Sequence, residues 1–361
     1  GDWDVTVINP IGIPPIAFGR YKPLVAACGD VREGRVSVYR RRFTLIPRFG
    51  GKRNPEAIVK AVLPLAKQLH AQRPFDLVDA QFFYPDGPAA AAIARTLGLP
   101  LTVKARGADI HHWGSIPWAL EQIRAVGRQA AGMLAVSRAL ADDMVAIGLP
   151  REKITVHYTG LDRDRFVPLG REEARMALAA DFGITLKRGD VLLTTVGALI
   201  ERKGQAFVIE ALTKLPKAVL ALAGNGPDSA QLQALAVQLG VADRVLFLGS
   251  IGHDTLPVLL SASHAMVLPS SSEGLANAWV EALACGTPIV IADAGGAREV
   301  VKDASAGRIV PRAADAIADA VKDLVSNPPP PEQVAANAAR FSWKATAANL
   351  AEYYTRILSA A

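Results

Sequence analysis

Short runs of apolar and β-branched residues alternate with amphipathic helical stretches along almost the whole chain, and this alternation limits the fold more than any other feature. Residues 191–197, 218–223 and 265–268 are typical of buried strands, and residues 229–240 and 277–285 are typical of the helices between them. Strands that alternate with helices usually pair in parallel, because each helix carries the chain back across the sheet. The pattern therefore predicts an α/β protein with mainly parallel sheets.

The 361 residues are enough for two domains, each with its own core. Two sets of alternating elements predict two Rossmann-like domains that face each other across a cleft. Charged residues and a proline interrupt the periodicity at 160–170, which places a first domain at 1–165 and a second at 166–340. Four consecutive prolines at 328–331 cannot continue a helix, so residues 341–361 are expected to form a helix that packs back on the first domain. The chain leads directly into a strand, so we expect the opening strand of the first domain to be missing.

The cysteines and the hydropathy pattern bear on where the protein works. Cys28 and Cys285 are the only cysteines and lack metal-ligand spacing, so we expect neither a disulfide framework nor a zinc site. The sequence has no charged-then-apolar leader and no apolar run of the roughly eighteen residues that span a bilayer. We therefore expect a cytoplasmic location.

The net charge of +6 includes one local basic cluster in the first domain. Its members are Arg40, Arg41, Arg42, Arg48, Lys52 and Arg53. Such a cluster is typical either of a surface that contacts an anionic membrane or of a solvated basic loop. Nucleic acid is not an expected partner, because aromatic residues do not interleave with the charges as stacking platforms would.

Two motifs in the second domain place ligand-binding groups at the ends of predicted strands. The sequence VLLTTVGALIERKG is an apolar strand that leads into Arg202 and Lys203, and ligands of parallel sheets bind at such carboxyl ends. These positive charges suit a diphosphate, and an exposed basic turn is the alternative. The sequence LALAGNGP contains Gly224 and Gly226, which allow a nucleotide to approach the backbone closely. A plain turn is the alternative for this motif.

The run PSSSEGLANAWVEALACGTPIVIADAGGARE, residues 269–299, places two carboxylates across a loop-to-helix junction. The helix after Glu273 offers free backbone N–H groups and a positive dipole end to an anion, and Glu281 stands where its carboxylate can accept hydrogen bonds from ribose hydroxyls. A loop acid and a solvent-facing helix glutamate are the alternatives for these two residues. Together with Gly295 and Gly296, the run is typical of a site for a sugar joined to a diphosphate.

These motifs follow one another as GALIERKG, AGNGP and SSSEG-x6-EALACGTPIVIADAGG, an order that resembles the carboxyl half of the retaining glycosyltransferases of family 4. Weaker matches in the first half are FFYPDGPAAAAIA, VKARGADI, AVSRALADDM and KITVHYTGLDRDRF. The resemblance covers almost the whole chain and implies the GT-B fold of two Rossmann-like domains. It also implies a nucleotide-diphosphate sugar as donor substrate, no metal and no cofactor.

The resemblance implies a role for each residue of the donor site. Glu281 would hold the nucleotide ribose, Glu273 would face the transferred sugar, and Lys203 would neutralise the diphosphate in place of a metal ion. Arg202 is the third residue expected to act in catalysis. The expected donor-binding residues are Gly197, Lys203, Gly224, Asn225, Gly226, Gly249, Ser250, Ile251, Glu273, Gly274, Leu275, Ala276 and Glu281.

The acceptor is expected on the first domain. The residues implied there are Tyr84, Asp86, Gly87, Arg106, Asp109 and His111. Two positions depart from the family pattern, since Ala198 stands where an arginine is usual and Arg106 stands where a histidine is frequent. Arg202 is the candidate to replace the missing cation, and His111 or His112 is the candidate to replace the missing histidine.

The predicted function is transfer of a sugar from a nucleotide-diphosphate sugar to a hydroxyl group of a saccharide or lipid-linked acceptor, with retention at the anomeric carbon. The predicted pathway is assembly of cell-surface polysaccharide or glycolipid at the inner face of the cytoplasmic membrane. A GT-B nucleotide-sugar 2-epimerase and a degenerate nucleotide-sugar-binding protein without turnover are the alternatives. A nicotinamide dehydrogenase is disfavoured because Ser229 replaces the third glycine of the dinucleotide motif, and a phosphate-loop NTPase because Arg35 and Val36 follow Gly34.

Overall fold

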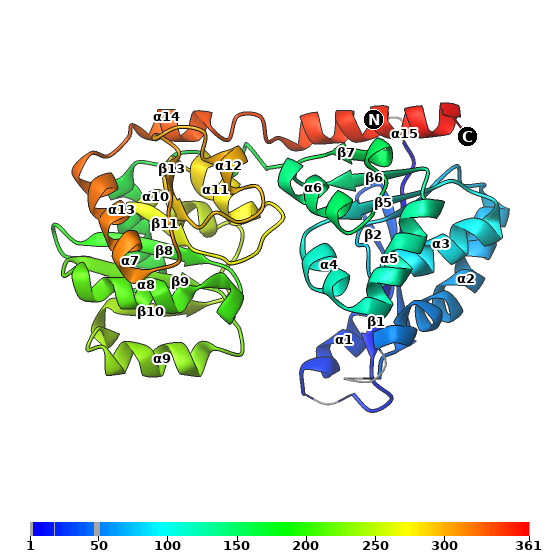
Figure 1. The fold of residues 1–361 in the computed structure, drawn as a ribbon. Coiled ribbons are helices and arrows are strands. Elements are labelled where there is room, and N and C mark those ends of the chain that lie inside the picture. Colours follow the sequence, from blue (N-terminus) through cyan, green and yellow to red (C-terminus); the bar gives the residue numbers. More distant parts are fainter. Residues whose placement is uncertain (1–2, 18, 47–50, 361) are drawn as a thin grey trace. The chain divides into compact units, whose positions relative to one another are not determined.

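The computed structural model describes residues 3–17, 19–46 and 51–360, and the chain divides into two compact units (Figure 1). The first unit comprises Gly1–His157 and Ala347–Ala361, and the second comprises Tyr158–Thr346. The division before residue 158 precedes the boundary after residue 165 that the sequence predicted. The last helix, α15 (Trp343–Ala360), begins in the second unit and continues into the first. No helix in the described part of the chain combines the length and the apolarity needed to cross a membrane.

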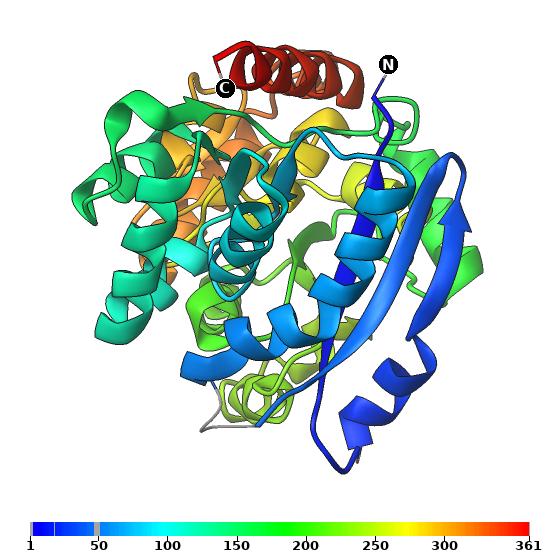
Figure 2. The same ribbon diagram turned by 90° about the vertical axis from the view of Figure 1, so that its right-hand side faces the viewer.

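The first unit contains a three-stranded sheet, of which the sequence predicted only the strand into which the chain leads at its start. Its strands are β1 (Thr6–Ile13), β2 (Gly29–Glu33) and β3 (Val36–Thr44), in the order β1-β3-β2, with β1 parallel and β2 antiparallel to β3. Helix α1 (Lys22–Ala26) lies between β1 and β2 in the chain. Helix α2 (Asn54–Gln72) covers the sheet, where its Ile58 and Val62 pack with Phe43 of β3 (Figure 2). All residues of β2 are exposed, so this strand lacks the alternation that marks a half-buried strand in a sequence.

The second sheet of the first unit is fully parallel. Its strands are β4 (Val78–Ala80), β5 (Leu101–Ala105), β6 (Gly132–Ala135) and β7 (Ile154–Val156), in the order β4-β5-β6-β7. The helices of this part are α3 (Asp86–Leu97), α4 (Ala108–His111), α5 (Pro117–Gln129) and α6 (Arg138–Ala146). Tyr353 of α15 lies against the start of β6, where a Cβ atom on Gly132 would lie 2.3 Å from the tyrosine hydroxyl oxygen. Only glycine leaves room for this contact.

The second unit is built on one six-stranded parallel sheet. Its strands are β8 (Val191–Val196), β9 (Ala218–Ala223), β10 (Val245–Gly249), β11 (Ala265–Leu268), β12 (Ile289–Ile291) and β13 (Gly307–Ile309), in the order β10-β9-β8-β11-β12-β13. The strand order reverses between β8 and β11, which are neighbours although β9 and β10 separate them in the chain. Parallel sheets bind their ligands outside the carboxyl ends of the strands at such a switch point. The fold therefore places a candidate site at the loops after β8 and β11.

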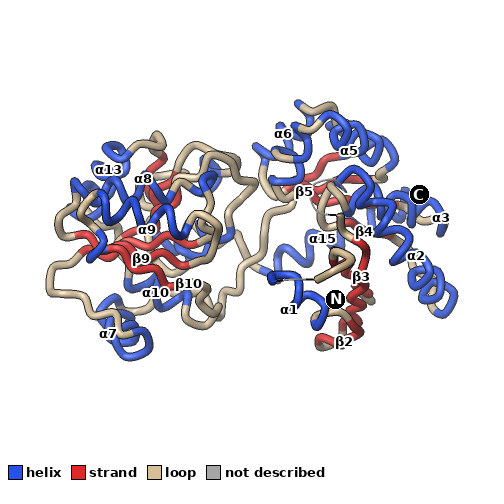
Figure 3. Tube along the Cα trace, turned by 90° about the horizontal axis from the view of Figure 1, so that it is seen from below, coloured by secondary structure: helices blue, strands red, loops and turns tan. Residues whose placement is uncertain are grey.

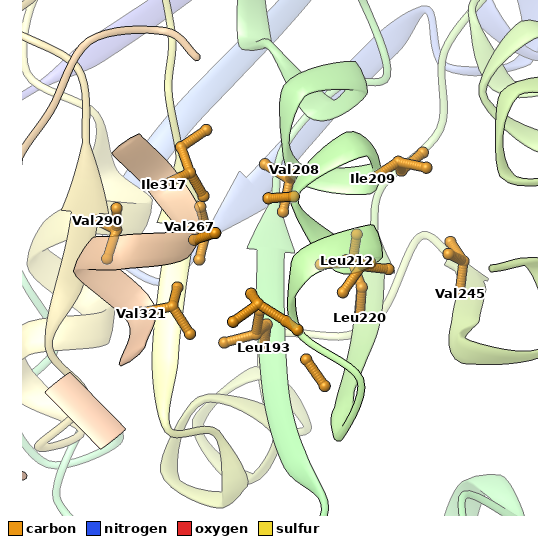
Figure 4. Packing of buried hydrophobic residues seen from close by; sticks show 14 of the residues in the cluster. Leu193, Val208, Ile209, Leu212, Leu220, Val245, Val267, Val290, Ile317 and Val321 are labelled. Carbon is orange, nitrogen blue, oxygen red and sulfur yellow. The ribbon is translucent and has the colours of Figure 1, made fainter. Parts of the chain in front are cut away.

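Helices cover both faces of this sheet (Figure 3). One face carries α8 (Gln205–Ala211), α9 (Ser229–Gln238) and α13 (Ala314–Ser326), and the other carries α7 (Arg171–Phe182) and α10 (Leu256–Ala262). The remaining helices are α11 (Asn277–Ala284), α12 (Ala297–Val300) and α14 (Pro331–Ala336). Leu193 packs with Val208 and Ile317 on the first face (Figure 4), whereas Leu192 packs with Leu178 on the second. Because both faces are buried, most of the strands read as continuous apolar runs, which explains why the sequence predicted β8, β9 and β11, whereas β13 was not predicted.

Candidate functional site

The switch point of the second unit brings together the loops after β8 and β11. The first loop contains the 3-10 turn Glu201–Lys203. The backbone N–H of Ser271 donates to the carbonyl oxygen of Arg202 over 2.8 Å, which ties the second loop to the first. Gly204 ends the turn with a φ of 74°, and a Cβ atom on it would lie 2.5 Å from the carbonyl oxygen of Pro269. Glycine at 204 is thus needed both for the turn and for the contact between the loops.

Glu273 is a buried carboxylate held between two cations. Its Oε1 atom lies 2.5 Å from Nζ of Lys203 and 3.3 Å from Nη1 of Arg202. The side chains of Glu273 and Lys203 are 10% and 13% exposed, whereas that of Arg202 is 38% exposed. The guanidinium of Arg202 also donates to the carbonyl oxygen of Ser272. Glu273 is therefore not a simple loop acid, and two cations with one carboxylate leave the group with a net positive charge.

The glycines after β9 hold neighbouring loops together. A Cβ atom on Gly224 would lie 2.0 Å from the carbonyl oxygen of Gly197, and one on Gly226 would lie 2.1 Å from that of Leu199. The sequence interpretation assigned Gly224 and Gly226 to the close approach of a nucleotide, but the close approach in the structure is between the two loops. Gly197 has a φ of 146°, a conformation that residues with a side chain rarely adopt. These glycines thus fix the shape of the candidate ligand-binding edge.

The predicted nucleotide-facing residues after β9 and β10 lie together at the same edge. Nδ2 of Asn225 donates to Oγ of Ser250 over 2.9 Å, and both side chains are exposed. The backbone N–H of Gly224 donates to the carbonyl oxygen of Gly249 over 2.7 Å. Ile251 is half-buried and packs against the core of the second face. Asn225 and Ser250 are therefore the polar side chains that this edge offers to a ligand.

A glycine pair after β12 supports the loop that begins at Glu273. A Cβ atom on Gly295 would lie 2.0 Å from the carbonyl oxygen of Glu273. The backbone N–H of Gly296 donates to the carbonyl oxygen of Gly274 over 2.9 Å. These contacts hold the backbone of Glu273 and Gly274 in place at the switch point.

Helix α11 follows this loop and carries Glu281. Leu275 and Ala276 precede the helix with 7% and 8% of their surface exposed, so they offer a ligand their backbone rather than their side chains. Within the described residues no side chain caps the helix at Ala276, which leaves N–H groups of the first turn available to an anion. Glu281 is half-buried, and desolvation raises its pKa against the opposing influence of His253. Glu281 is therefore not a solvent-facing helix glutamate.

Two buried polar atoms close in the chain to Glu273 and Glu281 have no hydrogen-bond partner among the described residues. They are Oγ of Ser270 and Nε1 of Trp279, and both side chains are fully buried. A buried polar atom without a partner costs about 1–3 kcal/mol, so a ligand or water that reached these atoms would stabilise the fold. The sequence interpretation missed both residues, because neither has a distinctive spacing. The described residues include no group of three or more His, Cys, Asp or Glu side chains placed to hold a metal ion.

Asp109 organises the loop after β5 in the first unit. Its buried carboxylate accepts hydrogen bonds from the backbone N–H groups of Phe83 at 2.9 Å, Arg106 at 3.0 Å and Gly107 at 2.8 Å. Burial raises the pKa of Asp109. Burial, together with the charge of Asp109, also raises the pKa of Asp86 to about 6. The structure thus brings these two predicted carboxylates close together, with Asp109 bonded to the backbone.

Arg106 and the two candidate histidines are each held by a neighbour. Nε of Arg106 donates to the main-chain oxygen of Gln81 over 2.8 Å, and Nη2 donates to Oε1 of the same residue over 2.7 Å. Nε2 of His111 lies 2.9 Å from Oδ2 of Asp143. The ring of His112 packs on that of Trp113. His111 and His112 each contact a neighbouring side chain. Arg106 itself occupies the position at which the family frequently has a histidine.

Tyr84 supports the fold rather than an acceptor. Its side chain is fully buried, and its hydroxyl donates to the carbonyl oxygen of Gly51 over 2.6 Å. Its ring lies 4.8 Å from that of Trp113 and 5.5 Å from that of Trp118, and burial raises its pKa to about 12. Gly87 is likewise buried. The predicted acceptor contacts at these two residues are thus corrected to packing positions.

Half of the basic cluster belongs to a strand, not to a loop. Arg40 pairs with Glu33 at 2.8 Å, and Arg41 pairs with Asp30. Arg42 donates to the carbonyl oxygen of Pro14. All three arginines lie on β3. Arg48 lies outside the described residues, and the exposed Lys52 and Arg53 lie in the turn before α2. The strand arginines are therefore engaged within the protein.

A buried polar row on β5 escaped the sequence interpretation. Thr102 and Lys104 alternate along the strand and so share one face. Nζ of Lys104 lies 2.8 Å from Nδ1 of His157, and both side chains are buried. Polar residues at every second position of an otherwise apolar strand are the signal that would have revealed this row.

Two family descriptions match the chain. Glycosyltransferase Family 4 matches residues 3–165, and Glycosyl transferases group 1 matches residues 179–341. The chain belongs to glycosyltransferase family 4. The family that the motifs predicted is therefore confirmed.

Several named proteins are similar to this member of family 4. A GDP-mannose-dependent alpha-(1-6)-phosphatidylinositol monomannoside mannosyltransferase of Mycolicibacterium smegmatis is 33% identical over 229 residues, 60% of this chain and 58% of that protein. A D-inositol 3-phosphate glycosyltransferase of Mycobacteroides abscessus is 32% identical over 251 residues, 66% of this chain and 55% of that protein. An alpha-D-kanosaminyltransferase of Streptomyces kanamyceticus is 28% identical over 75% of this chain and 76% of that protein. The chain thus spans little more than half the length of the first two relatives.

Solved structures share the fold of this member of family 4. Sucrose-phosphate synthase of Thermosynechococcus elongatus matches with a TM-score of 0.81 and 21% identity, over 100% of this chain and 90% of that one. HepE of Anabaena, in complex with UDP and glucose, matches with a TM-score of 0.76 and 22% identity, over 96% of this chain and 91% of that one. The predicted fold class, α/β with two Rossmann-like parallel-sheet domains, is confirmed, and the antiparallel β2 is the departure from it.

Proposed function

We propose that this protein transfers a sugar from a nucleotide-diphosphate donor to a hydroxyl group of a saccharide or lipid-linked acceptor, with retention at the anomeric carbon. The observation that carries the proposal is the buried carboxylate of Glu273 between Lys203 and Arg202, at the switch point of a parallel sheet. The proposed donor chemistry uses protein side chains and neither a metal ion nor a cofactor.

Positive charge at the switch point supports the departure of a nucleoside diphosphate. As the glycosidic bond breaks, the sugar becomes oxocarbenium-like and negative charge grows on the diphosphate. Lys203, Arg202 and the N-terminus of α11 would stabilise that charge. Because Ala198 supplies no cation, the partly exposed guanidinium of Arg202 is the proposed substitute for the arginine that is usual in the family.

Glu273 has two proposed tasks. In the empty site its carboxylate keeps Lys203 and Arg202 in place, which reduces the rearrangement needed when the donor arrives. With the donor bound, the diphosphate takes over the two cations, and the carboxylate faces the sugar. Its negative charge then stabilises the oxocarbenium-like ring. No covalent nucleophile is required.

Glu281 is the proposed ribose-binding residue. Its half-buried carboxylate has a raised pKa, and hydrogen bonds from ribose hydroxyls would offset the desolvation that causes the shift. Asn225 and Ser250, both exposed at the same sheet edge, are the side chains proposed to meet the base. These assignments give each part of the donor a residue in the second unit.

Asp86, Arg106 and Asp109 mark the proposed acceptor side in the first unit. In the proposed front-face route the leaving phosphate accepts the proton of the acceptor hydroxyl, so no base is required at Arg106. The relatives named for phosphatidylinositol monomannoside and D-inositol 3-phosphate support an acceptor of the saccharide or lipid-linked type.

A lipid-linked acceptor would bring the protein to an anionic membrane. Lys52 and Arg53 are exposed, whereas Arg40 and Arg41 are paired with acids, so the first two are the proposed contacts. We propose a cytoplasmic location at the inner face of the membrane and a role in cell-surface polysaccharide or glycolipid assembly.

A thermal-shift panel of nucleotide sugars tests the donor site. A ligand at a hundred times its dissociation constant adds about 2.7 kcal/mol to the free energy of unfolding, so the preferred donor gives the largest shift. Lys203→Ala and Glu281→Ala should each abolish that shift. Lys217→Ala is the control, because Lys217 is exposed at the opposite edge of the same sheet. An unchanged shift in both site variants would remove the proposed donor site.

Turnover is tested with the preferred donor. Release of free nucleoside diphosphate only in the presence of an acceptor identifies a transferase, whereas acceptor-independent release identifies a hydrolase. Conversion of the donor into its C2 epimer without net release of nucleoside diphosphate identifies a 2-epimerase. Binding with neither release nor epimerisation identifies a nucleotide-sugar-binding protein. The anomeric configuration of the product, read by NMR, tests retention.

A further inference from the structure

We infer that the acceptor carries an oxyanion, a phosphate or a carboxylate group, which Arg106 binds at the carboxyl edge of the parallel sheet of the first unit. The inference rests on the proposed glycosyl transfer and names the chemical class of its acceptor. Arg106 directly follows β5, which lies between β4 and β6. Ligands of parallel sheets bind at this edge, so Arg106 stands where an acceptor is expected.

The guanidinium of Arg106 is held in one orientation although it is exposed. Its Nε and Nη2 atoms both donate to Gln81, to the main-chain oxygen at 2.8 Å and to the side-chain oxygen at 2.7 Å. The amide of Gln81 donates in turn to Oδ2 of Asp79, and Oγ1 of Thr102 donates to Oδ1 of Asp79 over 2.5 Å. A guanidinium that is fixed along one edge loses little conformational entropy when it binds a ligand along the other.

The positive charge of Arg106 is not neutralised within the described residues, where its guanidinium forms hydrogen bonds to Gln81 but no ion pair. Asp109, the nearest acid in the chain, accepts hydrogen bonds from backbone N–H groups, including that of Arg106 itself. Asp79 is bonded to Thr102 and Gln81. An anionic ligand thus reaches Arg106 without first breaking an ion pair.

The chemistry of arginine favours binding over proton transfer at this position. A guanidinium stays protonated in proteins, so Arg106 cannot act as the base that a histidine would supply. Arginine has five N–H donors, and the two contacts with Gln81 leave three for a ligand. Such a planar set of donors matches the oxygens of a phosphate or a carboxylate.

Two more basic residues lie near this edge of the fold. Arg138 begins α6 directly after β6, the strand next to β5. Lys104 stands two residues before Arg106, and burial, with the charge of Arg106 as the next cause, lowers the pKa of Lys104 to about 8. The lowered pKa is consistent with an un-neutralised guanidinium nearby. Asp86 is the opposing charge in this region, and no described ion pair joins it to Arg106.

Calorimetric titration of the full chain tests the inference with three probes: glucose 6-phosphate, glucuronate and glucose. The donor site is first filled with the nucleoside diphosphate that gives the largest thermal shift, so that phosphate does not bind at Lys203. At least one anionic probe should bind the wild type about tenfold more tightly than glucose, the effect expected of a charge-assisted hydrogen bond. Arg106→Gln should remove this difference.

Two variants control for charge and folding. Arg95→Gln removes one charge from an exposed arginine that also donates to a glutamine side chain, Gln129, over 3.1 Å, and it should leave every affinity unchanged. Arg106→Lys keeps the charge but loses the planar donor set, so it should retain only part of the preference for anions. A preference that persists in Arg106→Gln, equal binding of the three probes, or equal losses in Arg106→Gln and Arg95→Gln would overturn the inference.

Vesicles distinguish a lipid phosphate from a soluble oxyanion. Arg106-dependent binding to phosphatidylcholine vesicles that contain phosphatidylglycerol, but not to pure phosphatidylcholine, assigns the oxyanion to a lipid. Dependence on Arg106 with the soluble probes alone assigns it to a free phosphate or carboxylate.

Nucleotide binding separates this inference from the proposed function. If Arg106→Gln binds the nucleoside diphosphate like the wild type, and if the affinities of the three sugar probes do not depend on Arg106, only the anionic acceptor is disproved. If no nucleoside diphosphate binds the wild type, the proposed function fails, and the probes are then tested in a Lys203→Ala background.

Discussion

Nζ of Lys203 lies 2.5 Å from Oε1 of Glu273, so the cation proposed to receive the diphosphate is already paired with the acid proposed to face the sugar. Both side chains are largely buried, and salt screens such a pair less than it screens a surface pair. Under the proposed function, the donor would therefore have to compete with Glu273 for Lys203. Glu273 should weaken the binding of the nucleotide while it prepares the site for the sugar.

Glu273→Gln should separate these two effects. The variant removes the competing negative charge, so a nucleoside diphosphate without sugar should bind about tenfold more tightly. Transfer should fall by roughly a hundredfold or more, because the oxocarbenium-like sugar loses a charge that stabilises it. Calorimetry and initial rates measure the two effects. Asp293→Asn, which breaks the exposed pair with Arg298, is the control, and weaker nucleotide binding in Glu273→Gln would contradict the competition.

Gly224→Ala should destabilise the second unit. The added Cβ atom would lie 2.0 Å from the carbonyl oxygen of Gly197, and residue 224 has a φ of 146°. Strain and overlap together should lower the free energy of unfolding by about 2–5 kcal/mol. Gly252→Ala is the matched control, because nothing lies within 4 Å of its Cβ position. Urea unfolding compares the two variants, and equal stabilities would show that the loops rearrange to admit the methyl group.

Asp86→Asn should change how stability depends on pH. Burial and the charge of Asp109 raise the pKa of Asp86 from 3.8 to about 6, so the folded state binds this proton more tightly than the unfolded state does. The contribution of Asp86 to the free energy of unfolding should therefore fall as the pH rises from about 4 to about 6. Near pH 7 the variant should be more stable by about 1–3 kcal/mol, and this gain should disappear below about pH 4. Unfolding curves across this pH range measure the difference in the free energy of unfolding. Asp76→Asn, at an exposed position, is the control, and its free energy of unfolding should depend on pH as that of the wild type does.

Two tyrosines should respond differently to loss of their hydroxyl groups. The hydroxyl of Tyr353 is buried without a hydrogen-bond partner in the described chain, so Tyr353→Phe should be neutral or stabilising. The hydroxyl of Tyr84 donates to the carbonyl oxygen of Gly51, so Tyr84→Phe should cost about 1 kcal/mol. Thermal and urea unfolding measure both, and a cost for Tyr353→Phe as large as that for Tyr84→Phe would contradict the assignment.

The doubly covered sheet of the second unit was predictable from the sequence, because neighbouring residues such as Leu192 and Leu193 are both buried and form apolar runs. The three-stranded sheet of the first unit was not. Strand β2 is exposed throughout, and Arg40 and Arg41 on β3 give a basic run that is typical of a loop. Their pairing with Glu33 and Asp30 depends on how two strands align, which no local pattern contains.

The candidate site was predictable as a set of residues but not as a set of contacts. The motifs identify Lys203 and Glu273 separately, and only the placement of β8 beside β11 reveals that they pair. Tyr84 has the residue type of a ligand contact but lies in the core. Lys104 was missed because the informative motifs lie at strand ends, although the polar Thr102 shares its face of β5.

The close packing of Gly224, Gly226 and Gly295 against neighbouring carbonyl groups has a consequence for how donor preference changes among related enzymes. Because these backbone contacts leave no room for a side chain, we expect the glycines to stay the same where the bound nucleotide differs. Changes in the preferred nucleotide are therefore expected to depend on the exposed side chains of Asn225 and Ser250. Libraries that aim to alter the accepted base should therefore randomise these two positions and leave the glycines untouched.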